Sequence, residues 1–229
     1  MPLTPRQYFT LRRLHSLTGV VPVGVFLLEH FFTNSFALQG AQAYNDKVAF
    51  LKSLPYLYLL ELFGIALPIV FHAALGVWIW WQARTNTAAL PYKQNVMFTV
   101  QRYTGVFLIF YIGYHVAVTR FGTLFGYENT DLFGLMKHHM ENPAIAVFYV
   151  LGILAASFHL GNGLWGFALH WGLVTEHKSQ KRWAWAAIAV SLALALAGLN
   201  SLLAFQPFGL KPVTIFSEPH ETQAEVTHR

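Results

Sequence analysis

Four histidines stand inside long apolar stretches of this 229-residue sequence, one in each of the first four stretches. They are His30, His72, His115 and His159; a fifth stretch, at residues 183–206, has none. An ionisable side chain inside such a stretch is costly in lipid and is therefore usually functional. A neutral imidazole nitrogen is a good ligand for iron, so the pattern predicts metal chemistry. The alternative for any one of them is a hydrogen-bonded interior histidine.

The depths of these histidines sort them into two pairs. His30 and His115 lie four and five residues before the polar residue that ends their stretch, so they stand ~6–8 Å deep in a helix. His72 and His159 each lie 17 residues after the residue that opens their stretch on the same side, which places them ~26 Å deep. Two facing imidazoles fill the axial positions of a haem, and helix bundles hold such cofactors in their cores. We therefore predict an outer and an inner bis-histidine haem b.

The elements that must position these residues are membrane-spanning helices. The sequence is 55% hydrophobic and only 11% charged, whereas soluble domains are about 25% charged. About 20 residues cross a bilayer, and five segments are long enough. They are residues 17–38, 56–82, 97–120, 143–172 and 183–206. The predicted fold is an all-α membrane protein, a bundle of five transmembrane helices enclosing two haems.

The distribution of charge predicts how the bundle is oriented. Lys and Arg are concentrated on the side of the N-terminus and of the second and fourth loops, so the N-terminus is expected in the cytoplasm and the C-terminus outside. Residues 1–206 would form the membrane domain, with an uncleaved first span, and residues 207–229 a polar extracytoplasmic tail. The net charge of +5 does not predict nucleic-acid binding, because the basic residues lie at the ends of apolar stretches.

The absence of cysteine limits the chemistry. It excludes disulfides, thiolate catalysis and covalent haem attachment within this chain. It also removes the usual thiolate ligands of an iron–sulfur cluster. Any haem must be held without a covalent bond to the chain.

Two further groups of polar residues lie near the predicted haems. A group at the cytoplasmic edge could bind the propionates of the inner haem, or could be basic interface anchors: Arg13, His15, Ser16, Arg102 and His170.

A group on the outer part of the second stretch could bind a ligand that exchanges protons. Glu61 lies ~9 Å below the outer edge and could exchange the protons, and Tyr56 and Tyr58 nearby could donate hydrogen bonds. The alternative is that Glu61 is a structural partner of an outer loop or helix.

Five other residues carry lesser expectations. Gly76 and Gly163 each follow a histidine by four residues, which predicts room for a haem ring or close helix packing. Glu29 is expected to contact water or a polar group. His138 and His139 fall in a predicted polar outer loop and are expected to be solvated.

Several stretches together resemble a known family. They are "RRLHSLTGVVPVG", "SLPYLYLLE", "LPIVFHAALGVWI", "QRYTGVFLIFYIGYHV" and "FHLGNGLWGFALHWG". They look like the single-chain dihaem cytochrome b anchor, of five helices, of succinate:menaquinone oxidoreductases and the related fumarate reductases, which are respiratory complex II enzymes. The resemblance covers roughly residues 8 to 206.

The resemblance implies a job and a set of partners. A flavoprotein (FAD) subunit and an iron–sulfur subunit would dock on the cytoplasmic face of a bacterial cytoplasmic membrane, and the whole complex could form a higher oligomer. Electrons from succinate would pass to the inner haem on His72 and His159, then to the outer haem on His30 and His115, then to menaquinone or another quinone. Reducing a quinone consumes two protons, so Glu61, Tyr56 and Tyr58 are the candidates for a quinone site, with Glu61 exchanging protons and the tyrosines hydrogen-bonding a carbonyl. Some fumarate reductases of the family carry a glutamate where this chain has Ser157, which favours succinate oxidation here.

Two other functions fit the same residues. One is the dihaem cytochrome b anchor of another respiratory enzyme, such as a fumarate reductase, a hydrogenase or a formate dehydrogenase. The other is a haem-free, proton-coupled transporter that uses the four histidines. In none of these readings is the chain by itself expected to oxidise succinate, since no flavin or dicarboxylate site is visible.

Overall fold

A computed structural model describes residues 4–83, 86–127, 131–207 and 209–214. Most of the predicted tail, with its acidic residues, lies outside the described residues. So do Arg84 and Glu128, two of the charges that entered the prediction of orientation.

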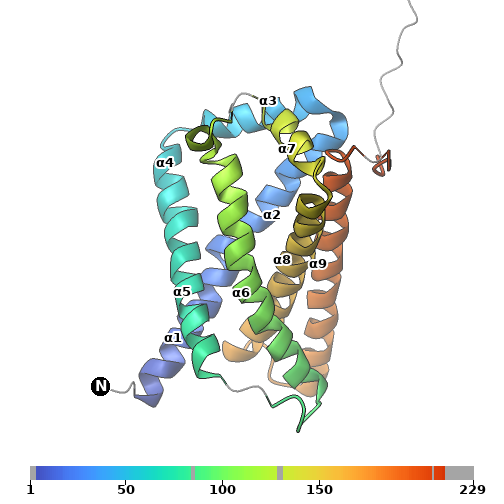
Figure 1. Cartoon of the computed structure of the whole chain (residues 1–229). Coiled ribbons are helices and arrows are strands. Elements are labelled where there is room, and N and C mark those ends of the chain that lie inside the picture. Colours follow the sequence, from blue (N-terminus) through green and yellow to red (C-terminus); the bar gives the residue numbers. More distant parts are fainter. Residues whose placement is uncertain (1–3, 84–85, 128–130, 208, 215–229) are drawn as a thin grey trace, which may run out of the picture.

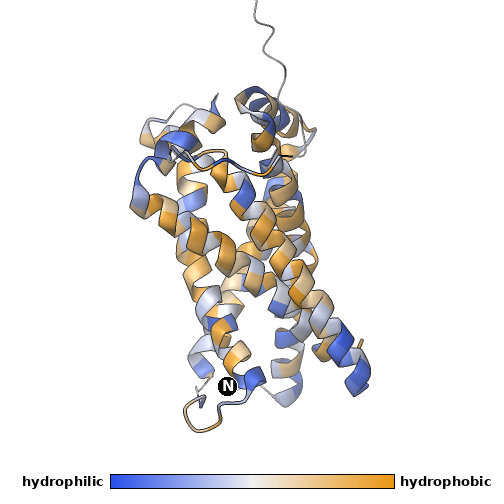
Figure 2. Cartoon of the chain, turned by 90° about the vertical axis from the view of Figure 1, so that its right-hand side faces the viewer, coloured by the Kyte–Doolittle hydropathy of each residue, from blue (hydrophilic) through white to orange (hydrophobic). Residues whose placement is uncertain are grey.

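Five helical segments within the described residues are long and apolar enough to cross a membrane. They are Pro5–Gln39, Leu57–Gln82, Lys93–Thr119, Pro143–His170 and His177–Leu203. They run side by side in one bundle (Figure 1), with apolar residues along its middle and polar ones gathered toward its ends (Figure 2). The predicted all-helical, five-span architecture is therefore confirmed.

The first span is two helices joined at a proline. Helix α1 (Pro5–Val20) begins well before the predicted start, because Thr4 and Gln7 form a capping box that satisfies the first backbone N–H groups. Helix α2 (Pro22–Ser35) follows after Val21. Proline has no N–H and clashes with the preceding turn, which accounts for the break at Pro22. A short 3₁₀ turn, η1 (Phe36–Gln39), ends the span.

The second span contains a π-helical segment. Helix α4 (Leu57–Leu59) leads into η2 (Leu60–Ala66), and α5 (Leu67–Gln82) completes the span. The N–H of Leu67 bonds to the carbonyl of Leu62, five residues back. Pro68 comes next and has no N–H to donate. The π-helical turn therefore lies where the regular hydrogen bonds between each N–H and the carbonyl four residues back are interrupted. Such π segments occur frequently at functional sites.

The last three spans are long single helices, and the middle one is the centre of the bundle. They are α6 (Lys93–Thr119), α8 (Pro143–His170) and α9 (His177–Leu203). Helix α8 packs against α9, α6 and α1. Gly161 and Gly198 allow the α8–α9 approach, since a methyl group at Gly161 would meet Ser191 and one at Gly198 would meet Ile153.

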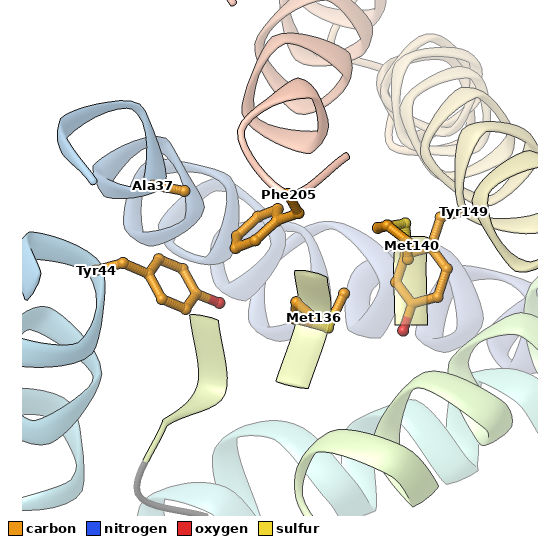
Figure 3. Close-up of a cluster of buried hydrophobic side chains, with 6 residues drawn as sticks. All are labelled: Ala37, Tyr44, Met136, Met140, Tyr149 and Phe205. Atoms are coloured by element: carbon orange, nitrogen blue, oxygen red, sulfur yellow. The ribbon is translucent and has the colours of Figure 1, made fainter. Parts of the chain in front are cut away.

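A helical cap covers the end of the bundle farthest from the N-terminus (Figure 1). It consists of α3 (Ala41–Lys52), the 3₁₀ turn η3 (Gly122–Phe125) and α7 (Leu132–Met140). Buried side chains from the cap meet the ends of α8 and α9 in one cluster (Figure 3): Ala37, Tyr44, Met136, Met140, Tyr149 and Phe205. Burial raises the pKa of Tyr44 to about 12, so its phenol stays neutral.

The cap corrects one prediction about the outer histidines. The segment that carries them is helix α7, not a loop. His138 is exposed as predicted, but His139 is buried at 6% exposure, with its ring 5.2 Å from that of Tyr127. Burial lowers the pKa of His139, and the neighbouring His138 adds to the effect. The prediction failed because this helix, with five apolar residues, three polar residues and a glycine, buries one face.

Asp131 fastens α7 to α3, which leads to a prediction. Its Oδ1 accepts from the N–H of Gly134 at 2.8 Å, as an N-cap, and from Asn45 Nδ2 at 2.8 Å. Removing an N-cap costs about 0.5–2 kcal/mol. Asp131→Ala should therefore speed amide hydrogen exchange across residues 132–140 by about 2- to 30-fold. Asp46→Ala, an exposed acid on the same cap, is the control and should not change it. Equal effects of the two variants would contradict the assignment.

The same contact should depend on pH. The Gly134 and Asn45 donors hold the pKa of Asp131 below its ordinary value of 3.8. The stabilisation is thus present above pH 3.8 and is lost as the pH falls through the lower, folded-state value. The protection factors of the α7 amides in the parent chain, corrected for the intrinsic exchange rate at each pH, should fall in that acidic range, and in Asp131→Ala this fall should be absent.

Candidate functional site

The structure brings the four intramembrane histidines together as two pairs, each between different helices. The ring centroids of His30 on α2 and His115 on α6 are 5.6 Å apart, with the rings at 80°. Those of His72 on α5 and His159 on α8 are 6.1 Å apart, at 84°. These are the same outer and inner pairs that the depth argument predicted.

The separation of each pair fits two axial ligands of one iron. An imidazole nitrogen binds a metal such as zinc at ~2.0 Å, and the ring centroid lies ~1.1 Å behind that nitrogen. Two imidazoles on opposite sides of one metal therefore have their centroids ~6 Å apart. Within the described residues, no three His, Cys, Asp or Glu side chains gather into a metal-binding group. A pair of imidazoles suits a haem, whose porphyrin supplies the other four ligands, better than a bare metal ion.

Hydrogen bonds orient the inner pair for this role. His72 Nδ1 donates to the backbone carbonyl of His15 at 2.9 Å, because a carbonyl can only accept. His159 Nδ1 lies 3.2 Å from the Thr104 hydroxyl, which itself donates to the carbonyls of Val100 and Gln101. Both rings thus carry their proton on Nδ1, and their Nε2 lone pairs are free to bind a metal.

Two glycines let neighbouring backbones approach the inner ligands. A methyl group at Gly19 on α1 would collide with the His72 ring, and one at Gly105 on α6 would lie 3.0 Å from His159 Cε1. The prediction had named other glycines for this purpose. Gly76 instead faces the His15 ring, and Gly163 faces Gln101 at 3.6 Å. The difference arises because the glycine that makes room for a histidine ring lies on the neighbouring helix that faces the ring, not on the helix that carries the histidine.

The two pairs are separated along the bundle. On α6, Gly105 contacts the inner ligand His159 and His115 belongs to the outer pair, ten residues farther on. On the first span, Gly19 and His30 stand eleven residues apart. At 1.5 Å per residue, the inner and outer levels are ~15 Å apart.

Three residues of the predicted propionate group meet Trp171 and His72. The Arg13 guanidinium lies over the Trp171 ring at 4.0 Å, and Trp171 Nε1 donates to Ser16 Oγ at 3.2 Å. Ser16 Oγ in turn donates to the Arg13 carbonyl at 3.0 Å, so this hydroxyl is already engaged. The His15 ring stacks on His72, with centroids 4.0 Å apart and planes at 13°.

Unsatisfied donors mark the same end of the bundle. The Nε atoms of Arg13 and Arg102 and Nδ1 of His15 are buried and have no hydrogen-bond partner among the described residues. A buried polar nitrogen without a partner costs free energy, so these atoms are expected to meet a hydrogen-bonding group in the working protein. Haem propionates would supply one. This orphaned set is a second observation, besides the histidine pairs, that fits a haem.

The remaining two propionate candidates line separate cavities. His170, at the end of α8, lines a small cavity together with Arg12 and Arg13 of α1. Arg102 lines another, with Trp80, Trp81 and Tyr103 among its neighbours. The structure therefore does not gather all five candidates into one contact group.

The quinone candidates lie at the outer end of the second and third spans. Glu61, in the π segment η2, forms a bidentate ion pair with Arg120. Arg120 Nε donates to Oε1 at 3.0 Å, and Nη2 donates to Oε2 at 2.9 Å. The Tyr58 ring lies 6.0 Å from the same guanidinium. Tyr56 starts α4 with a positive φ of 57° and is 78% exposed. Glu61 thus has the helix partner that the alternative interpretation expected.

Several contacting residues were missed from the sequence. Thr104 holds His159, Gln101 Nε2 donates to the His159 carbonyl at 2.9 Å, and Tyr149 contacts His115. One signal was available: Thr-Gly-Val occurs at residues 18–20 and again at 104–106, and the glycine of each faces an inner ligand. Glu29 finds a polar contact, as predicted, because Thr33 Oγ1 donates to it at 2.6 Å.

Comparison with known proteins agrees with this arrangement. The chain is 40% identical over 197 residues to the succinate dehydrogenase cytochrome b558 subunit of Bacillus subtilis strain 168, which covers 86% of this chain and 96% of that protein. A shorter match, 43% over 63 residues, links it to the succinate dehydrogenase hydrophobic membrane anchor subunit of Halobacterium salinarum, over 28% of this chain and 47% of that protein.

A family model matches as well. Residues 82–198, from the end of α5 through most of α9, match the succinate dehydrogenase/fumarate reductase transmembrane subunit family. The matched region contains His115 and His159, one ligand candidate of each pair. With the near full-length relative, this match means that the chain belongs to the succinate dehydrogenase/fumarate reductase family of transmembrane subunits.

Proposed function

We propose that this chain is the membrane anchor and electron-transfer subunit of a succinate dehydrogenase, passing electrons from an iron–sulfur subunit through two haems b to a quinone. The single observation that carries the proposal is the presence of two histidine pairs, each spanning two helices, at separations of 5.6 and 6.1 Å. The relationship to the Bacillus cytochrome b558 subunit supports the same function.

The chain's own residues would hold each haem from both faces. His72 and His159 would bind the inner one and His30 and His115 the outer one, all through Nε2. A haem with two imidazole ligands supplies one-electron transfer with no open position for oxygen. The protein's part is to fix the ring orientations, to keep water out of the bundle and to balance the propionate charge. Arg13 and Arg102, each with a buried and unpartnered Nε, are suited to that last task.

The end of the bundle near the N-terminus is the proposed docking face. Arg12, Arg13 and Arg102 lie there, close to the inner pair, and we place the iron–sulfur subunit on it with the flavoprotein subunit beyond. This requires the N-terminus to lie in the cytoplasm and the C-terminal tail outside a bacterial cytoplasmic membrane, as the charge pattern predicts. Residues 1–206 would then be the membrane domain, surrounded by lipid.

The quinone site is proposed at the opposite end, near the outer pair. Glu61 pairs with Arg120, which lies five residues, or ~8 Å along α6, beyond His115. Menaquinone is the quinone that the family resemblance favours. Tyr58 and Tyr56 are the candidate donors to its carbonyls.

The direction of electron flow is proposed as succinate oxidation. Ser157 occupies the position at which some fumarate reductases of the family carry a glutamate. Here the residue is 1% exposed, within the helix that packs on α9, so a carboxyl group is absent from this part of the bundle core. The family model covers succinate dehydrogenase and fumarate reductase subunits alike, and it gives no support to a hydrogenase or formate dehydrogenase anchor or to a haem-free transporter.

The haem content tests this function directly. We expect two noncovalent b-type haems per polypeptide, because the chain offers two ligand pairs and no cysteine. Pyridine haemochrome analysis of the purified complex, set against its protein content, measures the ratio. Acid–acetone extraction should remove all of the haem from the chain. One haem or none per chain would contradict the proposal.

A further inference from the structure

Tyr149 is the residue from which a further inference can be drawn. It lies on α8, ten residues before the inner ligand candidate His159, and is 3% exposed. Its hydroxyl lies 3.3 Å from Nδ1 of His115, the outer candidate on α6. A buried phenol needs a hydrogen-bond partner, and so does the second nitrogen of a buried imidazole. In this contact the phenol oxygen can accept the Nδ1 proton of the imidazole.

The packing around Tyr149 leaves it little freedom to turn away. Its ring meets that of His115 at 71° with centroids 5.8 Å apart, and it meets Tyr111 at 80° and 5.5 Å. Tyr111 stacks on His115 at 15°. Gly152, one turn along α8 from Tyr149, permits this arrangement, since a methyl group there would collide with the Tyr111 ring.

The cap closes the site from outside. Tyr149 belongs to the buried cluster in which Met136 and Met140 of α7 meet Phe205 at the end of α9 (Figure 3). Met140 is completely buried. The cluster therefore shields this side of the phenol from solvent.

We propose that Tyr149 is the positioning residue of the outer haem ligand His115, accepting the Nδ1 proton so that Nε2 faces the iron. The inference rests on the outer haem of the proposed function. It gives α8 a part in both sites, because the helix that carries His159 for the inner haem also orients a ligand of the outer one. A partner on the second nitrogen of a ligating histidine fixes its tautomer and makes it a stronger donor to the metal.

The expected consequence is a change in the outer haem alone. A histidine that gives up electron density more readily stabilises ferric iron over ferrous iron. Tyr149→Phe keeps the ring and its packing but removes the acceptor. The midpoint potential of the outer haem should therefore shift to a more positive value, with an altered g-value of its low-spin ferric signal, while the inner haem is unchanged.

The test is a redox titration and electron paramagnetic resonance of the assembled complex. Tyr111→Phe is the matched control, because it removes a hydroxyl beside the same imidazole, and that hydroxyl has no hydrogen bond to the described part of the chain. A shift or a loss confined to the outer haem of Tyr149→Phe supports the inference. An unchanged outer haem, an equal change in Tyr111→Phe, or an equal change in both haems overturns it.

The parent complex separates this outcome from the function itself. If the parent holds two haems and Tyr149→Phe behaves like the parent, only the positioning role fails. If the parent complex holds no outer haem, the proposed function is wrong, and the role of Tyr149 is wrong with it.

Discussion

Replacing one histidine of a pair should remove one haem and leave the other in place. In His72→Ala or His159→Ala the inner haem should be lost, and in His30→Ala or His115→Ala the outer one. Without covalent attachment, each haem depends on its two axial bonds and on packing, and a haem left with one ligand is held far more weakly. The expected haem content falls from two per chain to one.

The measurement uses the different spectra and potentials of the two haems. Redox difference spectra of the purified complexes should show the same component missing in His72→Ala and His159→Ala. The complementary component should be missing in the other two variants. His138→Ala is the control, because its side chain is 73% exposed on the cap and should leave both components intact.

Electron transfer to quinone should fail in all four variants, since each breaks the sequence of carriers. Succinate should still reduce a dye that accepts electrons from the catalytic subunits. The assignment of pairs would be wrong if His30→Ala and His72→Ala abolished the same spectral component, whatever the effect on turnover.

Glu61→Gln should abolish quinone reduction while both haems remain bound. If Glu61 exchanges protons with the quinone, its amide replacement keeps the shape and removes the proton-carrying group. General acid–base catalysis typically contributes about 10²- to 10⁴-fold, so a loss of at least about 10²-fold is expected in succinate–quinone turnover. Reduction of an artificial dye by succinate should be unaffected.

The ion pair with Arg120 supplies the comparison that this experiment needs. Both side chains are partly exposed, at 31% for Glu61 and 44% for Arg120, and such pairs contribute only ~0–1 kcal/mol to stability. If Glu61 served only to pair with Arg120, Glu61→Gln and Arg120→Gln would have the same small effect. A proton-exchanging role requires the first to be far more severe.

Haem content and dye reduction must be measured in both variants. Unchanged quinone turnover in Glu61→Gln would remove this residue from the quinone site. Equal losses in the two variants would assign the effect to the salt bridge between the second and third spans.

The sequence alone was sufficient to predict the class of fold and the order of the four histidines along the bundle axis. Apolar length identified five spans, and the structure confirms them. Counting residues from the outer polar markers separated two shallow histidines from two deep ones. The structure then brings His30 to His115 and His72 to His159. Both deductions work because a membrane-spanning helix must stay apolar over a set length and rises by about 1.5 Å per residue, so position in sequence converts to depth.

The contacts between side chains of different helices were decided only by the tertiary structure. The Tyr149 bond to His115, the Thr104 bond to His159 and the Arg120 partner of Glu61 join residues 34, 55 and 59 positions apart. His139 is buried because α7 lies over the bundle, and the pair of histidines with the neighbouring Lys137 had suggested an exposed segment instead. Depth depends on one helix at a time. Rotation about the helix axis and the identity of the neighbour depend on how all the helices pack, and a uniformly apolar helix gives no hydrophobic face from which to read that rotation.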